Sequence, residues 1–313
     1  MHKKALALLA GTALLFGVQA SAATLSSEAQ SVLPKSTRQI ISVDYHQLAN
    51  EPIAQQLESR VLPPGMRGLQ AMLVAGGINP ATDLNRLTFA TFASGKNVGL
   101  VGVAEGNFGS LNLSKFFHKT KKNPNPPQID GVNVYSSNGL AFFVPDQATV
   151  VFGPRDAVTQ AIQTQQGAPA LGQNEAMADL VAGTQSSTVW SVLDAGGAQS
   201  MVRGLIGGQA DQLAGKLIAK RFQGARYTIS FGNEVQVNLE MITTDALSAS
   251  ALATAMDADI AMRTREEHNA AAKALLQQVQ VDSAGNDAFL QVSVPSSSVG
   301  DLLSSDLLGA IVH

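Results

Sequence analysis

The feature that most constrains the fold is a strict alternation of apolar and polar side chains over two consecutive segments, 226–231 and 234–241. The apolar set is Tyr227, Ile229, Phe231, Val235, Val237, Leu239 and Met241. A period of two is that of a β-strand, whose successive side chains point to opposite faces. Because Gly232-Asn233 separates the segments, they predict an antiparallel hairpin with one buried face and one face in water.

Similar strand–turn–strand signals occur elsewhere in the chain. Glycine-containing turns join 87–92 to 98–104, 132–136 to 140–144, and 279–282 to 289–294. Asn138-Gly139 is the strongest of these signals, because both residues tolerate positive φ. Helical patterns cover 46–62, 66–76, 111–118, 195–222 and an Ala-rich stretch over 245–278. Antiparallel hairpins mixed with helices predict an α+β fold.

The order of these signals occurs twice. One strand ends at Asp44 and another at Asp194, each before a helical region, and Val144-Pro145 and Val294-Pro295 show the same offset of 150 residues. We therefore expect two similar modules, 38–167 and 188–313, each an antiparallel sheet with helices packed on one face. Residues 168–187 are expected to form a linker with a short helix. Residues 23–37 are expected to form a flexible N-terminal tether.

The first 22 residues have the pattern of a secretory signal peptide. A basic start at 1–4 precedes an apolar run over 5–18, and Ala20-Ser21-Ala22 is a small-x-small cleavage site. The run is shorter than the roughly 20 residues that a membrane-spanning helix needs. We expect export, with cleavage after Ala22, to the periplasm or the medium.

Composition removes several classes of function. The chain has no cysteine, which excludes disulfides, Cys-ligated zinc, iron–sulfur clusters and thiol catalysis. Loss of Lys3 and Lys4 with the signal peptide lowers Lys+Arg from 21 to 19 against 24 Asp+Glu, a net charge of −5. Such a surface does not favour nucleic acid or anionic lipid. No later apolar run approaches membrane length, so a soluble rather than membrane-embedded protein is expected.

Motifs that assemble catalytic, cofactor or metal sites are not found in the sequence. The four histidines of the mature chain lie at no metal-binding spacing. Gly-x-Ser-x-Gly, Ser-x-x-Lys and phosphate-loop patterns are absent as well. We therefore expect no catalytic residue, cofactor or metal, which favours a non-enzymatic protein.

Two groups of residues remain as candidate sites. A basic loop on an acidic protein predicts an anion or partner site, the alternative being a solvated loop. Its residues are Lys115, His118, Lys119, Lys121 and Lys122. Asp44 and Asp194 end equivalent strands and could meet as an acidic pair that shares a proton or a metal. The pattern favours the alternative, in which each caps the helix that follows it.

The strand-to-Asp segments Ser42-Val43-Asp44 and Trp190 to Asp194, with the two Val-Pro turns, carry a weak family resemblance. In this order of elements the chain resembles uncharacterised exported bacterial proteins with duplicated α+β modules, over about residues 38–312. The resemblance implies the fold and the export but no activity.

These observations predict an exported, soluble, non-enzymatic binding or interaction module. Its partner would be an envelope or extracellular protein or an anionic ligand. One alternative is a carrier of apolar ligands, which requires a dry cavity between the sheet and its helices. Another is a hydrolase whose carboxylates come from distant segments and converge in a cleft.

Overall fold

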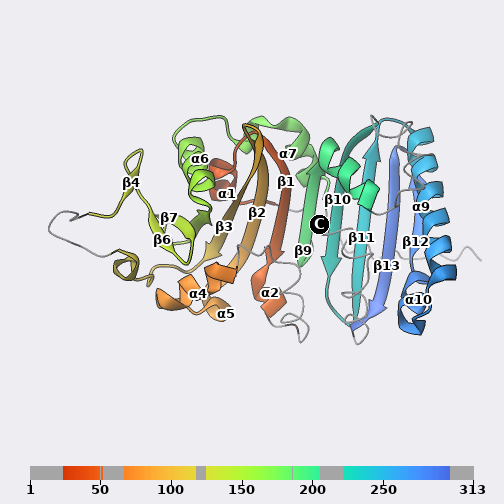
Figure 1. Ribbon diagram of the computed structural model, residues 1–313, viewed down its shortest axis with the longest axis horizontal. Coiled ribbons are helices and arrows are strands. Elements are labelled where there is room, and N and C mark those ends of the chain that lie inside the picture. Colours follow the sequence, from red (N-terminus) through yellow and green to blue (C-terminus); the bar gives the residue numbers. More distant parts are fainter. Residues whose placement is uncertain are drawn as a thin grey trace, which may run out of the picture.

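The structure is a computed structural model that describes residues 24–49, 51, 67–117, 125–184, 186–204 and 221–296. Its framework is one sheet of eleven strands in the order β12-β13-β11-β10-β9-β1-β2-β3-β8-β7-β6 (Figure 1). Every neighbouring pair is antiparallel, and a separate two-stranded hairpin, β4–β5, stands at the β6 end. The predicted α+β class with antiparallel pairing is confirmed.

The elements have the following bounds. The strands are β1 (Thr37–Asp44), β2 (Leu84–Ser94), β3 (Asn97–Gly106), β4 (Gln128–Ile129), β5 (Val132–Asn133), β6 (Tyr135–Ser137), β7 (Leu140–Asp146), β8 (Thr149–Gly153), β9 (Val189–Asp194), β10 (Phe222–Ser230), β11 (Glu234–Thr243), β12 (Gln280–Ala284) and β13 (Asp287–Pro295). The helices are α1 (Ser27–Val32), α2 (Tyr45–Ala49), α4 (Arg67–Ala75), α5 (Pro80–Asp83), η2 (Leu113–Phe116), α6 (Arg155–Gln165), η3 (Leu171–Gln173), α7 (Glu175–Ala182), α9 (Ala246–Glu266) and α10 (Ala270–Leu276), with a further helix over 195–204.

The turns between the strands have the backbone geometry that their sequences demand. Asn138 and Gly139, between β6 and β7, have φ values of 50° and 83°. Positive φ at both central residues matches the right-handed twist of a two-stranded hairpin, and it favours Asn-Gly. The alternating segments around Gly232-Asn233 form β10 and β11, paired from Phe222 to Thr243.

The middle of the sheet joins the two predicted modules. β1 and β9 lie side by side, with Ile41 opposite Ser191. From this pair the order outward is β2-β3-β8-β7-β6 on one side and β10-β11-β13-β12 on the other. Two copies of one unit would give such an order, but a duplication remains a prediction. All eleven strands belong to one sheet, so the modules share their framework.

Two hydrophobic clusters cover the opposite faces of the sheet. The first extends along the whole sheet and takes in residues of α4, α9 and α10, such as Met72, Met256 and Leu275. The second is built on the strands from β9 to β7, with Ile242 of β11 packed against it, and takes in residues of α1, α6 and α7, such as Val32 and Ile162. Among the described residues, helices therefore lie on both faces of the sheet from β9 to β7, where α7 also reaches β10, and on one face of β11, β13 and β12 (Figure 1).

The sequence predicted helices on only one face of residues 38–167, and this prediction is wrong because helices cover both faces there. In β7, Phe142 belongs to the first cluster and Phe143 to the second, and both side chains are fully buried. In β8, Val151 and Phe152 are divided between the clusters in the same way. Because these strands carry apolar side chains on both sides, both sides need cover.

The segment expected to be a flexible tether is in part packed against the protein. Residues 27–32 form α1, with Ser26 accepting a hydrogen bond from the backbone N–H of Ala29 as N-cap. Ala29, Val32 and Leu33 are buried in the second cluster. The apolar spacing from Leu25 to Leu33 lets this short helix bury one side. The expected linker likewise forms η3 and α7, whose Met177 and Leu180 are buried there.

Candidate functional site

The candidate site is the part of the second face, from β10 to β12, over which no described helix lies beyond the contact of α7 with β10, and we call it the polar sheet face. It consists of the solvent-facing side chains of four neighbouring strands, β10, β11, β13 and β12. They include Arg226, Thr228, Ser230, Glu234, Gln236, Asn238, Glu240, Ile242, Gln280, Asp282, Asp287, Phe289, Gln291, Ser293 and Pro295. Alternate residues of the same strands are buried in the first cluster, so the polar set must point the other way.

A row of uncharged side chains crosses this face from strand to strand. Thr228 lies opposite Asn238, Asn238 opposite Gln291, and Gln291 opposite Gln280. The Asn238 Nδ2 atom donates a hydrogen bond of 3.4 Å to Thr228 Oγ1. Neighbouring strands lie about 4.8 Å apart, so the row presents hydrogen-bonding groups at that spacing.

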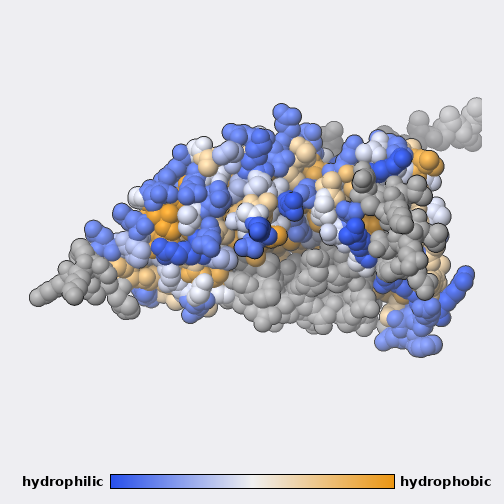
Figure 2. Space-filling model, turned by 45° about the horizontal axis from the view of Figure 1, so that its top comes forward, coloured by the Kyte–Doolittle hydropathy of each residue, from blue (hydrophilic) through white to orange (hydrophobic). Residues whose placement is uncertain are grey.

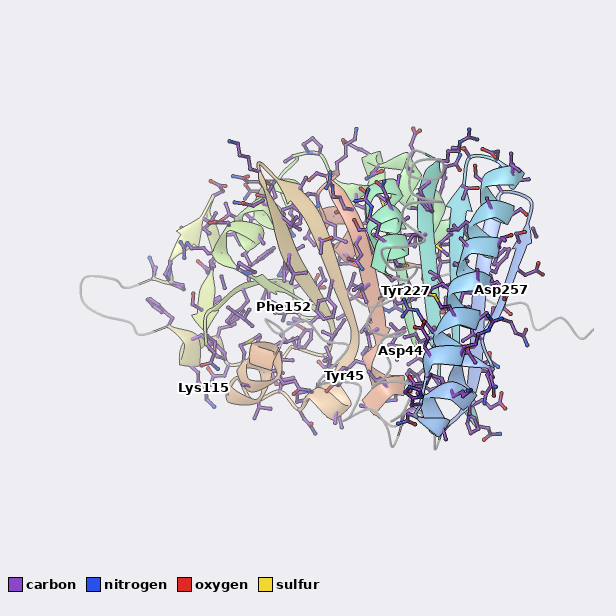
Figure 3. All side chains as sticks on the ribbon, turned by 45° about the vertical axis from the view of Figure 1, so that its right-hand side comes forward. Asp44, Tyr45, Lys115, Phe152, Tyr227 and Asp257 are labelled. Atoms are coloured by element: carbon purple, nitrogen blue, oxygen red, sulfur yellow. The ribbon has the colours of Figure 1, made fainter. Side chains whose placement is uncertain are left out.

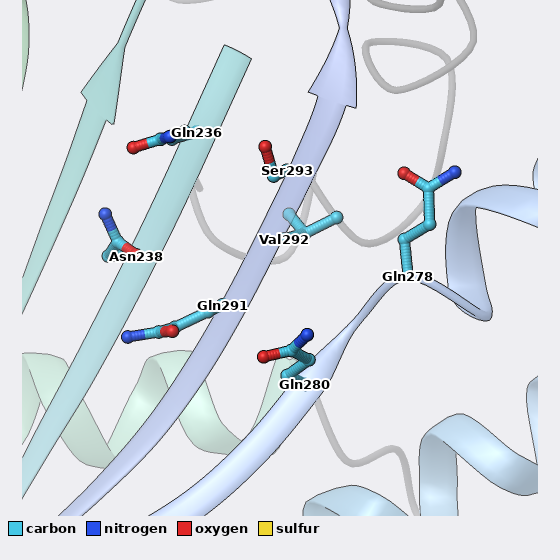
Figure 4. A pocket seen from close by; sticks show the side chains of 7 residues that line it. All are labelled: Gln236, Asn238, Gln278, Gln280, Gln291, Val292 and Ser293. Atoms are coloured by element: carbon cyan, nitrogen blue, oxygen red, sulfur yellow. The ribbon is translucent and has the colours of Figure 1, made fainter. Parts of the chain in front are cut away.

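A hollow of about 360 Å³ lies over this row (Figure 4). Its lining residues are Gln236, Asn238, Gln278, Gln280, Gln291, Val292 and Ser293, none of them charged. Among the described residues, none of the four glutamine side chains has a hydrogen-bond partner in the protein. Each primary amide offers two donors and an acceptor, so the hollow presents several polar groups that no described residue engages.

Acidic residues surround this neutral centre. Glu234, Glu240 and Asp282 lie on the same face, and the Oε2 atom of Glu234 accepts a hydrogen bond of 2.6 Å from Ser293. Glu240 pairs with Arg226, whose Nε lies 3.5 Å from Glu240 Oε2. Burial raises the pKa of Glu240, Arg226 lowers it, and Asp287 raises it further. The face as a whole is therefore unfavourable for anions.

Arg226 also marks the border of the polar sheet face. Its Nη1 donates a hydrogen bond to the carbonyl oxygen of Gly183, the residue that ends α7. The guanidinium thus joins β10 to the last helix that covers the second face. Beyond this contact the described helices cover only the opposite face.

The structure does not bring Asp44 and Asp194 together. Their strands are antiparallel, and Asp44 lies beside Thr188, six residues from Asp194. At about 3.3 Å per residue the two carboxylates are separated by roughly 20 Å, too far to share a proton or a metal. Asp44 Oδ1 accepts a hydrogen bond of 2.9 Å from the backbone N–H of Gln47, and Asp194 Oδ1 accepts one of 2.7 Å from Gly197. Both bonds are of the N-capping type.

Most of the basic loop falls outside the described residues. His118, Lys119, Lys121 and Lys122 are in that position, so their binding role stays a prediction. Lys115 belongs to η2 and is exposed. It lies near β6, at the opposite end of the sheet from α9 and Asp257 (Figure 3). The structure therefore separates Lys115 from the polar sheet face.

Four buried hydroxyls lie in the sheet without a hydrogen bond of normal geometry within the described ranges. Ser42 faces Thr88 on the second face, and Ser191 faces Tyr227 on the first. Burial raises the pKa of Tyr227 to about 12, although nearby Ser191 opposes the shift. A phenol with this pKa stays protonated near neutral pH and is unsuited to acid–base catalysis there.

In the parts of the chain that the structure describes, no three His, Asp or Glu side chains gather into a group able to hold a metal ion. Nor does any helix there have the length and apolar character to cross a bilayer. On the side shown in Figure 2, hydrophilic residues dominate the coloured surface. The exposed large apolar side chains are spread over α4, β3 and α9.

Sequence reasoning missed the hollow because its walls come from three strands whose spatial order differs from their chain order. β13 lies between β11 and β12, although β12 precedes it in the chain. A usable signal was present in the polar positions of the alternating strands. These positions hold amides rather than charges at Gln236, Asn238 and Gln291.

The fold defines an α+β protein with one large antiparallel sheet, whose second face is covered by described helices from β9 to β7. No protein-family model and no curated protein match the sequence. Two crystal forms of the Treponema protein TP0453, forms I and III, are similar in structure at 10% sequence identity, with TM-scores of 0.47 and 0.46. The similarity covers 90% of this chain and 98% and 99% of theirs.

Proposed function

We propose that this chain is an exported, non-enzymatic binding protein and that the polar sheet face is its binding surface. The observation that carries the proposal is the hollow of about 360 Å³ lined by glutamine amides without partners among the described residues. A volume of this size lies within the range of ligand pockets. The signal-peptide pattern of residues 1–22 supports export, which would bring the face into contact with envelope or extracellular partners.

The contrast between the two halves of the sheet supports the same proposal. On the second face, α1 and α6 shield the first half and α7 shields β9 and the adjoining part of β10, whereas β11 and β13 carry hydrogen-bonding side chains there. A face that only meets water is ordinarily rich in Lys, Glu and Asp. The centre of the polar sheet face is uncharged, and it is better suited to a partner that forms hydrogen bonds with side-chain amides.

The carrier of apolar ligands has less support. It requires a largely apolar pocket, and Val292 is the one apolar residue among those that line the hollow. The hydrolase with distant carboxylates would need two acids close together. Its strongest pair, Asp44 and Asp194, lies at opposite ends of the central strands.

The test compares capture by three forms of the mature protein, residues 23–313. Gln280→Ala/Gln291→Ala removes two amides from the hollow. The matched control, Gln163→Ala/Gln165→Ala, removes two exposed amides from α6. Each form is immobilised and exposed to envelope extract, and captured protein and carbohydrate are both analysed.

We expect one or more components of the extract to bind the wild type and the control but not Gln280→Ala/Gln291→Ala, which we call the hollow variant. The melting temperatures of all three forms should be alike. Equal capture by all three forms, or no capture by any, would refute the polar sheet face as the binding surface.

A further inference from the structure

The chemistry of the hollow narrows its ligand to a neutral molecule. The lining carries no charge, and the surrounding carboxylates of Glu234, Glu240 and Asp282 repel anions. Arg226, the basic residue of the polar sheet face, is already paired with Glu240. Phosphorylated and carboxylated ligands are therefore disfavoured on grounds of charge.

The hydrogen-bonding capacity points to a ligand with many hydroxyl groups. Gln236, Gln278, Gln280 and Gln291 each present two N–H donors and a carbonyl acceptor on an exposed side chain. A sugar hydroxyl both donates and accepts, so it can engage either end of such an amide. Lipid-like ligands would leave these groups unpaired, at a cost in binding free energy.

The position on a sheet face argues against a peptide. Extended peptides bind by adding a strand to a sheet edge, where backbone groups are free. Here β11 and β13 are paired on both sides, so their backbone bonds are used within the sheet, and of the strands that line the hollow β12 alone has a side without a described strand partner. The hollow also lacks the apolar subsites that would hold peptide side chains.

Phe289 adds the aromatic surface that a sugar ring would need. It lies two residues before Gln291 on β13, about 7 Å along the strand, and on the same face. Its side chain is partly exposed and, among the described residues, is a member of neither hydrophobic cluster. A pyranose has an apolar C–H face and a hydroxyl-bearing edge, which match the ring and the amide row respectively.

We propose that the polar sheet face binds an uncharged oligosaccharide, with the row Asn238, Gln291 and Gln280 contacting hydroxyl groups and Phe289 stacking on a sugar ring. This inference rests on the proposed function, because it names the ligand class of the same surface. It goes further in committing to a neutral carbohydrate rather than to a protein or an anion.

The experiment titrates the full mature protein, labelled with ¹⁵N-glutamine, with maltohexaose, cellohexaose and chitohexaose. Hexagalacturonate serves as the anionic counterpart. Side-chain amide resonances of Gln280 and Gln291 are assigned by their loss in the corresponding alanine variants. We expect at least one neutral oligosaccharide to shift both resonances in a saturable way, and hexagalacturonate to leave them unchanged.

Variants then test the roles of the side chains. Gln280→Ala and Gln291→Ala should each weaken binding of that oligosaccharide about 2- to 10-fold, the range expected for one net hydrogen bond. Phe289→Leu, which keeps an apolar side chain, should also weaken it. Gln163→Ala/Gln165→Ala should not, and the melting temperature should stay the same throughout.

Several results would overturn the inference. The first is that none of the three neutral oligosaccharides shifts the amide resonances of Gln280 and Gln291, and the second is that hexagalacturonate shifts them equally. The third is that Gln280→Ala and Gln291→Ala bind the oligosaccharide with the same affinity as the control variant. If the capture experiment still separates the hollow variant from the control, the polar sheet face binds a different class of partner and the proposed function stands. If both experiments fail, the proposed function fails as well.

Discussion

Replacing Gly102 by alanine tests how the core under the first half of the sheet is packed. Gly102 lies in β3 between Phe89 of β2 and Phe152 of β8. The two rings meet edge to face, with centroids 6.3 Å apart and planes at 88°. A Cβ atom on Gly102 would lie 2.3 Å from Cζ of Phe152, where ordinary contact begins at 3.4 Å. The ring would therefore have to move by about 1.1 Å.

The expected magnitude follows from that displacement. Phe152 is fully buried, so its ring can move only by disturbing its neighbours. Overpacking of this kind typically costs about 1–3 kcal/mol. Alanine also has less conformational freedom than glycine in the unfolded chain, which stabilises the folded state by about 0.4–1 kcal/mol. From the midpoints of these two ranges, we expect Gly102→Ala to lower the free energy of unfolding by about 1.3 kcal/mol, measured by urea denaturation followed by circular dichroism.

Two further variants make the test specific. Gly172→Ala is the control, because a Cβ there would meet nothing within 4 Å, and its effect should stay within about 0.5 kcal/mol. In Gly102→Ala/Phe152→Leu the smaller side chain makes room for the methyl group. The double variant should therefore lose at least about 1 kcal/mol less than the sum of its single variants. Wild-type stability of Gly102→Ala, or additive losses, would refute the steric reasoning.

Four other outcomes can be checked. Tyr227→Phe removes a buried hydroxyl that completes no hydrogen bond of normal geometry within the described residues. The free energy of unfolding should therefore stay the same or rise by up to about 1 kcal/mol, and a decrease of more than about 1 kcal/mol would contradict this. The pKa of Glu240 is raised on folding, so the folded protein holds the proton of this carboxyl more tightly than the unfolded chain does. The contribution of Glu240 to the free energy of unfolding should therefore fall as the pH rises from 4.5 through the raised pKa. In melting experiments at a series of pH values, Glu240→Gln should remove this fall in stability. Asp44→Ala should lower stability by about 0.5–2 kcal/mol in chemical denaturation, whereas Asp44→Asn, which can still cap, should not. Mass spectrometry of the exported protein should find its N-terminus at Ala23, and an intact residue 1 would refute cleavage.

Local patterns foretold the elements well where the side-chain period was strong. β10 and β11 occupy the segments that alternate around Gly232-Asn233. Asn138-Gly139 turns the β6–β7 hairpin with the expected positive φ. The predicted short helix near 174–182 is α7, and the Ala-rich stretch forms the helix pair α9 and α10. These features depend on near neighbours in the chain, so sequence carries the signal for them.

The candidate site was less predictable, because its residues become neighbours only through strand pairing. In the sequence, Asp44 and Asp194 end strands at equivalent positions of the two predicted modules, which suggested that their carboxylates could lie close together. Antiparallel pairing of β1 and β9 placed them at opposite ends instead. Gln280, Gln291 and Asn238 drew no attention, because no short motif links them. The insertion of β13 between β11 and β12 put the three in one row.

The sequence by itself determined the α+β class, the hairpins and the apolar face of each alternating strand, because side-chain period and turn chemistry act within a few residues. Only the tertiary structure decided that both halves share one sheet and that the described helices on the second face lie over β9 to β7 and reach no further than β10. Those outcomes depend on β1 pairing with β9, about 150 residues away, and on where α1, α6 and α7 find apolar surface to bury. The polar sheet face exists because no described helix from the second half packs against that side of β10 to β13.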